Sequence, residues 1–285
     1  MNSNTAYPVL LLCGCDPDRR ELMKIHDPQG KLPSKALLPM AGKRVLDWQL
    51  EALIESPDIS EIYLIGLTQE EFPSDLDIKY IPHERNSSIL EKIKFGSDFI
   101  QEIHPDLQHI VVCSGDAPGM TVESIAKFFV DMRQNLDADF MIGVVPEKIT
   151  LKFFPEHNRV IGKFKEISVY PGELYVFRYE IIPILEDEIR QLTIKRRQFD
   201  RQKDTSKLLP VLTYLAKKPQ LWYLIIKYSL GRLSIAELES ILTSVYGLKM
   251  KAIVVPDPGF GMDLDLPEDY ERITEYIKKT KFQAV

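Results

Sequence analysis

Short apolar runs alternate with amphipathic segments over the first 145 residues of the chain. The runs have the length of buried strands, and several end in glycine, proline or aspartate, which favour turns. They predict strands at residues 7–12, 61–67, 78–81, 109–113 and 139–145. Between them, apolar residues recur at helical spacing and predict helices at residues 45–54, 88–103 and 121 to about 132. This alternation is typical of right-handed βαβ units.

A series of βαβ units predicts an α/β fold with a mixed, mostly parallel sheet and helices on both faces. Ligands of such sheets bind beyond the carboxyl ends of the strands. Two loops of unusual composition leave strands at that end, one after Leu12 and one after Cys113. We therefore expect a functional site at this edge. Residues 16–33 are charged and hold three prolines and a glycine, which predicts a long surface loop.

The pattern of hydrophobic residues changes after Pro146. Basic and aromatic residues alternate over residues 148–165, which predicts a hairpin, and residues 168–178 predict a strand with a turn at Pro171 and Gly172. Beyond residue 180, the pattern predicts helices at 181–192, 206–216, 220–230 and 235–246. It also predicts a strand at 251–255 and a terminal helix at 267–279. We expect one α/β domain formed by residues 1–179 and 247–285, with residues 180–246 as a helical insertion in it.

The composition is that of a globular protein, with 285 residues of which 45% are hydrophobic. A net charge of −6 favours a small-molecule partner over nucleic acid. The three cysteines lack a disulfide spacing, the N-terminus has no apolar leader, and no apolar run reaches the roughly 18–20 residues of a membrane span. We expect a cytoplasmic protein without a transmembrane segment. The apolar segment 221–233 and the basic run 195–201 are compatible with a peripheral membrane contact, a lipid substrate or an oligomer contact.

Three polar clusters are suited to phosphate and metal chemistry. Lys35 follows the predicted loop, and a lysine is a compact cation for phosphate oxygens. Asp116 follows an apolar strand between glycine and Ala-Pro, a position from which a carboxylate can hold Mg²⁺. Asp263 and Asp265 are two positions apart, and such residues share one face of an extended chain. Each cluster alone also has an ordinary interpretation as a solvated lysine, a turn aspartate or a helix cap.

Together the three clusters resemble a known family. Residues 35–43 are similar to the K-a-L-l-p-l-a-G-k-P signature of nucleotidyltransferases, residues 114–118 to its G-D-x-P metal motif, and residues 263–270 to D-I-D-T-P-E-D. Their order and separation resemble the molybdenum cofactor guanylyltransferase-like (MobA-like) branch of the NTP transferases. The resemblance implies a three-layer, Rossmann-like fold of the glycosyltransferase-A type. It also implies Mg²⁺- or Mn²⁺-dependent transfer of NMP from an NTP to an acceptor, usually phosphorylated, with release of pyrophosphate.

The resemblance also assigns roles to single residues. Lys35, Asp116 and Asp265 take the places of the catalytic lysine and the two metal ligands, with Asp263 as the alternative ligand. The candidate nucleotide-binding residues are Leu12, Cys13, Gly14, Cys15, Arg20 or its neighbour Arg19, Lys35, Asn86, Ser88 and Gly115. The loop after the first strand lacks the usual G-x-G-x-R pattern, which leaves the base preference open. The candidate acceptor-binding residues are Lys163, Gly172 and Glu173.

Two other functions are compatible with these residues. One is a glycosyltransferase of the same fold that uses a nucleotide sugar, although the lysine signature at residues 35–43 argues against it. The other is a catalytically inactive nucleotide-binding regulator, which the atypical loop after Leu12 permits. A nucleotidyltransferase releases pyrophosphate from an NTP, whereas the glycosyltransferase does not. Nucleotide binding without turnover identifies the regulator. The NTP, the acceptor, the oligomeric state and the role of the insertion are not predicted.

Overall fold

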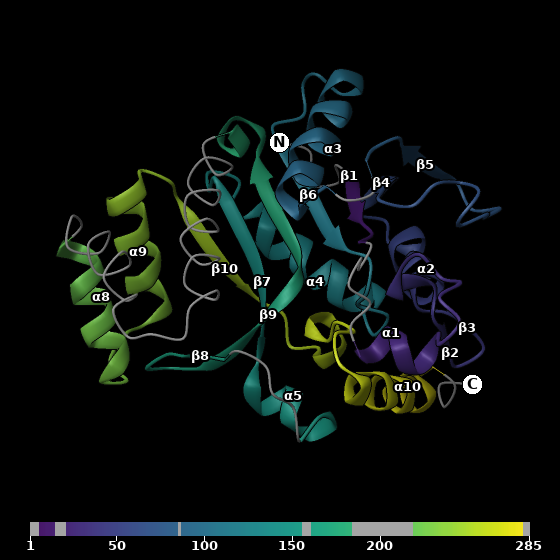
Figure 1. The fold of residues 1–285 in the computed structure, drawn as a ribbon. Helices are drawn as coiled ribbons and strands as arrows, with labels where there is room; N and C mark the ends of the chain where they lie inside the picture. The colour runs from purple at the N-terminus through teal and green to yellow at the C-terminus, as the bar shows by residue number, and fades with distance from the viewer. Residues whose placement is uncertain (1–5, 15–20, 85–86, 156–160, 184–218, 282–285) are drawn as a thin grey trace, which may run out of the picture.

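The computed structural model of the chain describes residues 6–14, 21–84, 87–155, 161–183 and 219–281. At its centre is an eight-stranded sheet of order β10-β7-β9-β6-β1-β4-β5, with β8 paired to β9 (Figure 1). Its strands are β1 (Tyr7–Leu12), β4 (Ile59–Ile65), β5 (Ile78–Ile81), β6 (His109–Ser114), β7 (Phe140–Pro146), β8 (Gly162–Lys163), β9 (Ser168–Arg178) and β10 (Met250–Val254). A second, two-stranded sheet pairs β2 (Pro39–Met40) with β3 (Lys43–Arg44).

The sheet is mixed but mostly parallel, as predicted. The pairs β1–β4, β1–β6, β4–β5 and β7–β10 are parallel, whereas β9 runs antiparallel between β6 and β7. Helices cover both faces, with α2 (Val45–Glu55) and α4 (Val122–Arg133) on one and α3 (Ile89–Ile103) on the other. The remaining long helices are α9 (Ile235–Tyr246), which contacts the edge strand β10, α8 (Pro219–Ser229), which contacts α9, and α10 (Pro267–Lys281). The shorter helices include α1 (Glu21–His26), α5 (Glu147–Phe153) and the 3-10 turns η1 (Lys35–Leu37), η2 (Tyr179–Ile181) and η4 (Pro258–Gly261).

Alternate residues of β1 contact the two helical layers. Val9 and Leu11 belong to the apolar cluster on the side of α2 and α4, while Leu10 belongs to the cluster on the side of α3. All three side chains are fully buried, and each contributes about 1.5–3 kcal/mol through burial. The central strand is therefore packed on both faces, which holds the carboxyl ends of β1 and β6 in fixed positions.

A further apolar cluster supports the segments that carry Lys35 and the acidic pair. Its buried members are Leu22, Met23, Leu38, Met40, Val45, Trp48, Phe154, Met262, Leu264, Ile273, Tyr276 and Ile277. Leu38 follows η1, and Leu264 lies between Asp263 and Asp265. Because these two leucines are packed in one cluster, the segment after Lys35 is held beside the acidic pair.

Two predictions of local structure are wrong, because tertiary packing and not the local sequence pattern determines the structure of these segments. Residues 21–26 of the predicted loop 16–33 form α1, whose Leu22 and Met23 are buried in the cluster with Trp48. Residues 147–153 form the short helix α5 rather than one arm of the predicted hairpin 148–165. Among the described residues of this region, β8 and the start of β9 form a short hairpin.

The predicted turn at Pro171 and Gly172 is also wrong. β9 continues through both residues, and its pairing with β7 is irregular between Ile142 and Val144. The extra residues of β9 are taken up at this irregularity, and interruptions of the regular ladder are positions where a sheet tolerates proline. Gly172 lies against Phe260, so a Cβ at this position would come within 2.7 Å of the phenyl ring.

The helices predicted at 220–230 and 235–246 are confirmed as α8 and α9. The helix predicted at 206–216 and most of the one predicted at 181–192 lie outside the described residues. After α9 the chain returns to the sheet as β10, and Glu239 of α9 accepts a hydrogen bond from the Ala252 N–H at 2.8 Å. This contact satisfies a backbone donor on the edge strand, which would otherwise be open to pairing. Within the described ranges, none of the helices has the length and apolar character needed to cross a membrane.

Candidate active site

Asp116 follows the carboxyl end of β6 and is buried, with 8% of its surface exposed. The Ser114 hydroxyl donates a hydrogen bond to its Oδ1 atom. Between them, the Gly115 N–H donates to the Leu12 carbonyl at 2.8 Å, and a Cβ at Gly115 would lie 2.6 Å from Cys13 Sγ. Only a glycine allows this approach. The ends of β1 and β6 therefore meet beside the Asp116 carboxylate.

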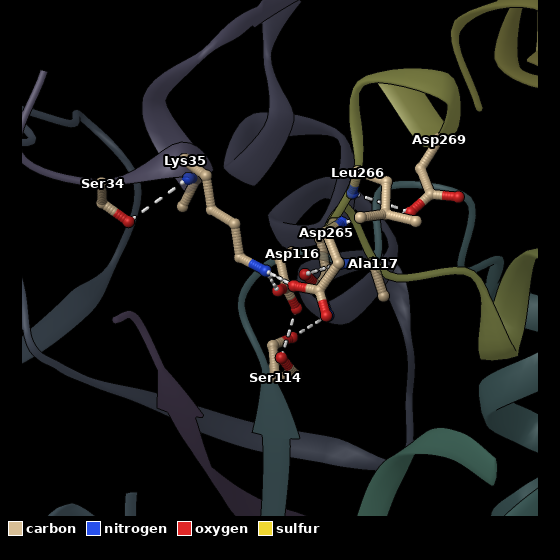
Figure 2. Close-up of polar contacts among 10 residues, drawn as sticks. Ser34, Lys35, Ser114, Asp116, Ala117, Asp265, Leu266 and Asp269 are labelled. Carbon is tan, nitrogen blue, oxygen red and sulfur yellow. Dashed lines mark hydrogen bonds and ion pairs between the residues drawn. The ribbon is translucent and has the colours of Figure 1, made fainter. Parts of the chain in front are cut away.

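Lys35 begins η1, and the Ser34 hydroxyl caps this turn by accepting a hydrogen bond from the Ala36 N–H at 3.3 Å. The Lys35 ammonium lies 2.6 Å from Asp116 Oδ2 and also forms an ion pair with Asp265 (Figure 2). Burial by itself lowers the pKa of Lys35, but the carboxylates of Asp116 and Asp265 outweigh it and raise this pKa above its ordinary value. Lys35 is thus a fixed positive charge at the sheet edge.

Asp263 and Asp265 lie in the extended segment between η4 and α10. The intervening Leu264 is fully buried, which turns both aspartates toward the opposite side, as the spacing predicts. The Leu264 N–H donates to the Asp116 carbonyl at 3.0 Å, so a backbone hydrogen bond joins the two acidic segments. One carboxylate oxygen from each of Asp116, Asp263 and Asp265 lies within 4.8 Å of the others.

This donor set fits a hard divalent cation. Carboxylate oxygens are the protein ligands of Mg²⁺ and Mn²⁺, and Mg²⁺ takes one or two of them together with substrate phosphates and water. The three oxygens come from two segments that packing and the Leu264 hydrogen bond hold together. The Lys35 ammonium already lies between Asp116 and Asp265, so the electrostatics of the site favour positive charge there.

The neighbouring acid Asp269 has a different task. Its Oδ2 atom accepts hydrogen bonds from the Leu266 N–H at 2.9 Å and the Asp265 N–H at 3.4 Å, at the start of α10. A carboxylate in this position satisfies backbone donors that a helix leaves unpaired. Asp269 therefore caps α10, and it also fixes the backbone of Asp265.

Gln49 of α2 is a positioning residue that the sequence analysis missed. Its side chain is fully buried and spans the loop that carries Asp116: Nε2 donates to the Ser114 carbonyl at 2.5 Å, and Oε1 accepts from the Ala117 N–H at 3.2 Å. The available signal was a polar residue inside the apolar stripe of a predicted helix. Such a residue is buried only when it finds hydrogen-bond partners.

The sequence analysis also missed Lys92 of α3, another polar residue of a predicted amphipathic helix. The side chain is buried, with 4% of the residue exposed, and its ammonium donates to the Cys13 carbonyl at 3.3 Å. Close beside it lies Gly66 after β4, where φ is +103° and a Cβ would lie 1.7 Å from the Cys13 oxygen. Lys92 therefore places a buried cation against the start of the loop after β1.

The candidate nucleotide-binding residues are only partly described. Leu12 and Cys13 lie beside Asp116, and a Cβ added at Gly14 would meet no atom of the described residues within 4 Å. Ser88 caps α3 by accepting a hydrogen bond from the Glu91 N–H at 3.2 Å. Cys15, Arg19, Arg20 and Asn86 lie outside the described residues. Cys13 and Cys113 are buried thiols, and burial raises the pKa of Cys113, which makes it unreactive.

The candidate acceptor residues do not form one group. Lys163 of β8 is exposed, and its N–H contacts the Tyr228 hydroxyl at 3.1 Å. Gly172 is buried against Phe260 and so belongs to the core. Glu173 is half-buried beside Cys113 of β6, whose pKa it helps to raise. A cavity of about 430 Å³ near β8 is lined by Pro146, Glu147, Lys148, Phe164, Lys165, Glu166, Ile167 and Ser168.

No protein-family model matches this chain, and no curated protein sequence does. Solved structures resemble its fold. A hypothetical transferase from Thermus thermophilus is 22% identical and aligns over 93% of this chain and 100% of its own, with a TM-score of 0.63. A nucleotidyl transferase from Methanothermobacter thermautotrophicus is 12% identical over 96% and 99%, with a TM-score of 0.54. CMP:2-keto-3-deoxy-manno-octonic acid synthetase, complexed with CTP, is 12% identical over 96% and 99%, with a TM-score of 0.51. The chain thus has the α/β fold of these transferases.

Proposed function

We propose that this protein is a Mg²⁺-dependent nucleotidyltransferase, which transfers NMP from an NTP to a small-molecule acceptor, usually phosphorylated, and releases pyrophosphate. One observation carries the proposal: Lys35, Asp116 and Asp265 converge at the carboxyl edge of a sheet whose fold nucleotidyltransferases also have. The motif resemblance to the MobA-like branch supports the same reaction. We further propose that residues 1–179 and 247–285 form the catalytic domain.

The reaction requires in-line displacement at the α-phosphorus of the NTP. An oxygen of the acceptor forms the new P–O bond, the bond to the β-phosphate oxygen breaks, and pyrophosphate leaves with the bonding electrons. A phosphate acceptor is already ionised at neutral pH, so no general base is needed. Catalysis then depends on positioning and on neutralising negative charge.

The residues of this chain provide both effects. Lys35 carries its charge at the sheet edge, where it can pair with phosphate oxygens. Asp116, with Asp265 or Asp263, would hold the cation, which when bound neutralises charge on the α-phosphate and on pyrophosphate. Ser114 and Gln49 keep the Asp116 loop in place through the hydrogen bonds described above. Water exclusion is favoured by the buried position of Asp116.

The first test is the Asp116→Asn variant. It keeps the size of the side chain and removes its charge, so we expect pyrophosphate release to fall by about 10²-fold or more. Asp131→Asn is the matched control, because Asp131 forms an exposed pair with Lys127 on α4 and should keep full activity. The substrate is first selected by thermal shift with CTP, UTP, GTP and ATP in the presence of Mg²⁺, since a ligand of the native state raises its stability.

The outcomes separate the competing functions. Activity of Asp116→Asn equal to that of the wild type, with the selected NTP and a phosphorylated acceptor, would contradict the proposal. Turnover of a nucleotide sugar without release of pyrophosphate from any NTP would identify a glycosyltransferase instead. Binding of an NTP without turnover over a panel of phosphorylated acceptors would identify a nucleotide-binding regulator.

A further inference from the structure

Lys92 on α3 is a buried cation, and within the described ranges of the chain no carboxylate pairs with it. The residue is 4% exposed, and among the described residues its ammonium makes one hydrogen bond, to the Cys13 carbonyl at 3.3 Å. A buried charge is costly unless it is paired, and lysine is rarely buried to this extent without a partner. A backbone carbonyl is neutral and does not cancel the charge. The Lys92 ammonium therefore has the character of a binding group for an anion.

Lys92 lies at the edge of the sheet that carries the candidate active site. Its ammonium contacts Cys13, which follows β1, and is 3.4 Å from the position that a Cβ on Gly66 would take after β4. Helix α3 packs against both of these strands (Figure 1). The other neighbour of β1 is β6, which leads to Asp116. Because neighbouring strands lie about 4.8 Å apart, Lys92 is one to two strand spacings from Asp116 along this edge.

The backbone beside the Lys92 ammonium is packed on one side and leaves space on the other. At Gly66, φ is +103°, and a Cβ would overlap the Cys13 oxygen at 1.7 Å, so the end of β4 closes against this carbonyl. Gly14 follows Cys13, and a Cβ there would meet no atom of the described residues within 4 Å. An ammonium has three N–H donors, and the Cys13 carbonyl uses one of them. The other two remain for a ligand in the space beside Gly14.

The charges of the candidate active site leave the triphosphate of an NTP incompletely neutralised. The site brings together the carboxylates of Asp116, Asp263 and Asp265. Against these three negative charges it sets the single ammonium of Lys35. A bound divalent cation would bring this group close to neutral, whereas the triphosphate carries several negative charges. Binding the triphosphate therefore needs further positive charge, and Lys92 provides one at the same edge of the sheet.

We propose that Lys92 binds an oxygen of the β- or γ-phosphate of the NTP, the part that leaves as pyrophosphate. This inference rests on the proposed function and adds a phosphate-binding residue to it. A hydrogen bond from an ammonium to a phosphate oxygen is charge-assisted and therefore strong. Negative charge grows on the leaving group as its bond to the α-phosphorus breaks, and a cation held in place stabilises that charge.

Two other roles for Lys92 leave its charge unexplained. A keto oxygen of the base would accept a hydrogen bond from the ammonium, but it is neutral and would not compensate a buried cation. A purely structural link between α3 and the Cys13 carbonyl needs a donor but no charge. A phosphate oxygen both accepts the hydrogen bond and neutralises the ammonium.

The test compares three ligands by isothermal titration calorimetry of the full chain with Mg²⁺: the NTP selected by thermal shift, its NMP and inorganic pyrophosphate. Lys92→Gln keeps a donor for the Cys13 carbonyl and removes the charge. We expect the affinities for the NTP and for pyrophosphate to fall by about tenfold or more, and that for the NMP by less than about twofold. Lys94→Gln is the matched control, because Lys94 forms a half-exposed pair with Asp98 on the same helix and should leave all three affinities unchanged.

Two further measurements cover a Lys92→Gln variant that does not fold. Lys92→Met fills the same space without charge and should show the same selective loss for the NTP and pyrophosphate. A crystal structure of the wild type with Mg²⁺ and the NTP needs no variant, and in it the Lys92 ammonium should lie within hydrogen-bond distance of a β- or γ-phosphate oxygen.

Several results would overturn the inference. Wild-type affinities in Lys92→Gln would show that the residue only links α3 to the Cys13 carbonyl, and equal losses for the NTP and the NMP would show that it does not bind the phosphates. A changed preference among CTP, UTP, GTP and ATP would assign it to the base. All three leave the proposed function intact, whereas failure of every NTP to bind the wild type would overturn both.

Discussion

The Lys35 side chain pairs with a carboxylate that lies 230 positions away in the sequence. Each of the three clusters was visible in the sequence, because a lysine after a loop and acids after apolar segments stand out from their surroundings. The sequence did not show that a single ammonium would lie between Asp116 and Asp265, since this contact depends on how α10 and η1 pack. Gln49 stood out as a polar residue in an apolar helix stripe, but its partners are two backbone atoms of a loop that follows another element, and the sequence does not identify them.

Replacing Lys35 by methionine should affect stability and metal response together. The variant leaves Asp116 and Asp265 as neighbouring negative charges, with oxygens that come within 4.8 Å. At an effective dielectric constant near 20, such a pair repels by about 3 kcal/mol, so we expect a lower thermal midpoint without metal. We also expect Mg²⁺ to raise the midpoint more than in the wild type, and pyrophosphate release to fall by about 10²-fold.

Differential scanning fluorimetry with and without MgCl₂ measures the metal response of Lys35→Met. Lys127→Met is the control, because Lys127 forms an exposed pair with Asp131 and should change stability by no more than about 1 kcal/mol. Equal Mg²⁺ shifts in the wild type and in Lys35→Met would show that Lys35 does not share its carboxylates with a cation.

Replacing Gln49 by leucine should destabilise the loop that carries Asp116. The change leaves the Ser114 carbonyl and the Ala117 N–H without their buried partner, and each unsatisfied group costs about 1–3 kcal/mol. We expect urea unfolding to show a loss of about 2–4 kcal/mol, together with reduced pyrophosphate release. Gln108→Leu, at an exposed position before β6, should be neutral, and comparable losses in both variants would contradict this role for Gln49.

At the scale of elements, periodicity predicted most strands and helices to within a few residues, because half-buried elements repeat with the period of their geometry. It failed where tertiary contacts override the local pattern. α1 exists because Leu22 and Met23 enter a core cluster, and β9 passes through Pro171 where its pairing with β7 is irregular. The antiparallel placement of β9 between β6 and β7 was also beyond local patterns, since strand order depends on contacts between distant segments.

A charged cluster at the β4–β5 edge should control acid stability. Glu61 accepts hydrogen bonds from the Tyr63 hydroxyl at 2.7 Å and from His104 at 2.6 Å, and it pairs with Lys79. Burial raises the pKa of Glu61, but the hydrogen bonds from Lys79, Tyr63 and His104 prevail and lower it from 4.5 to about 2. A lowered pKa stabilises the fold above the unfolded-state pKa, and this stability is lost as the pH falls from about 4.5 to about 2.

Glu61→Gln should therefore remove part of the acid dependence of stability. We expect the difference in free energy of unfolding between wild type and variant to be largest near neutral pH and to shrink below pH about 4.5. Urea titrations at a series of pH values measure it. Glu102→Gln, at an exposed position on helix α3, serves as control. A difference that stays constant down to pH about 2 would show that Glu61 does not titrate in this window.

At the scale of the whole molecule, both ends of the segment between β9 and β10 meet at one residue. The Arg178 N–H donates to the Asp139 carbonyl at 2.7 Å, and the Asp139 N–H donates to the Lys249 carbonyl at 2.7 Å. The chain therefore leaves and re-enters the sheet at neighbouring points, as the proposed helical insertion 180–246 requires. Excision is tolerated best where the two ends lie close together at the surface.

We predict that a variant in which a short Gly/Ser linker replaces residues 183–247 still folds. The linker keeps Ile181 and Ile182, which are buried, and it removes Glu239, so the Ala252 N–H on the edge strand loses its acceptor. That hydrogen bond is worth about 1 kcal/mol, and a domain of this size loses about 2–4 °C of its thermal midpoint per kcal/mol. We expect a midpoint lowered by several degrees, but the same rise on addition of Mg²⁺ and the selected NTP, because Lys35, Asp116 and Asp265 all lie outside the deleted segment.

A variant that unfolds, or that folds without responding to the nucleotide, would instead make residues 183–247 part of the catalytic domain itself.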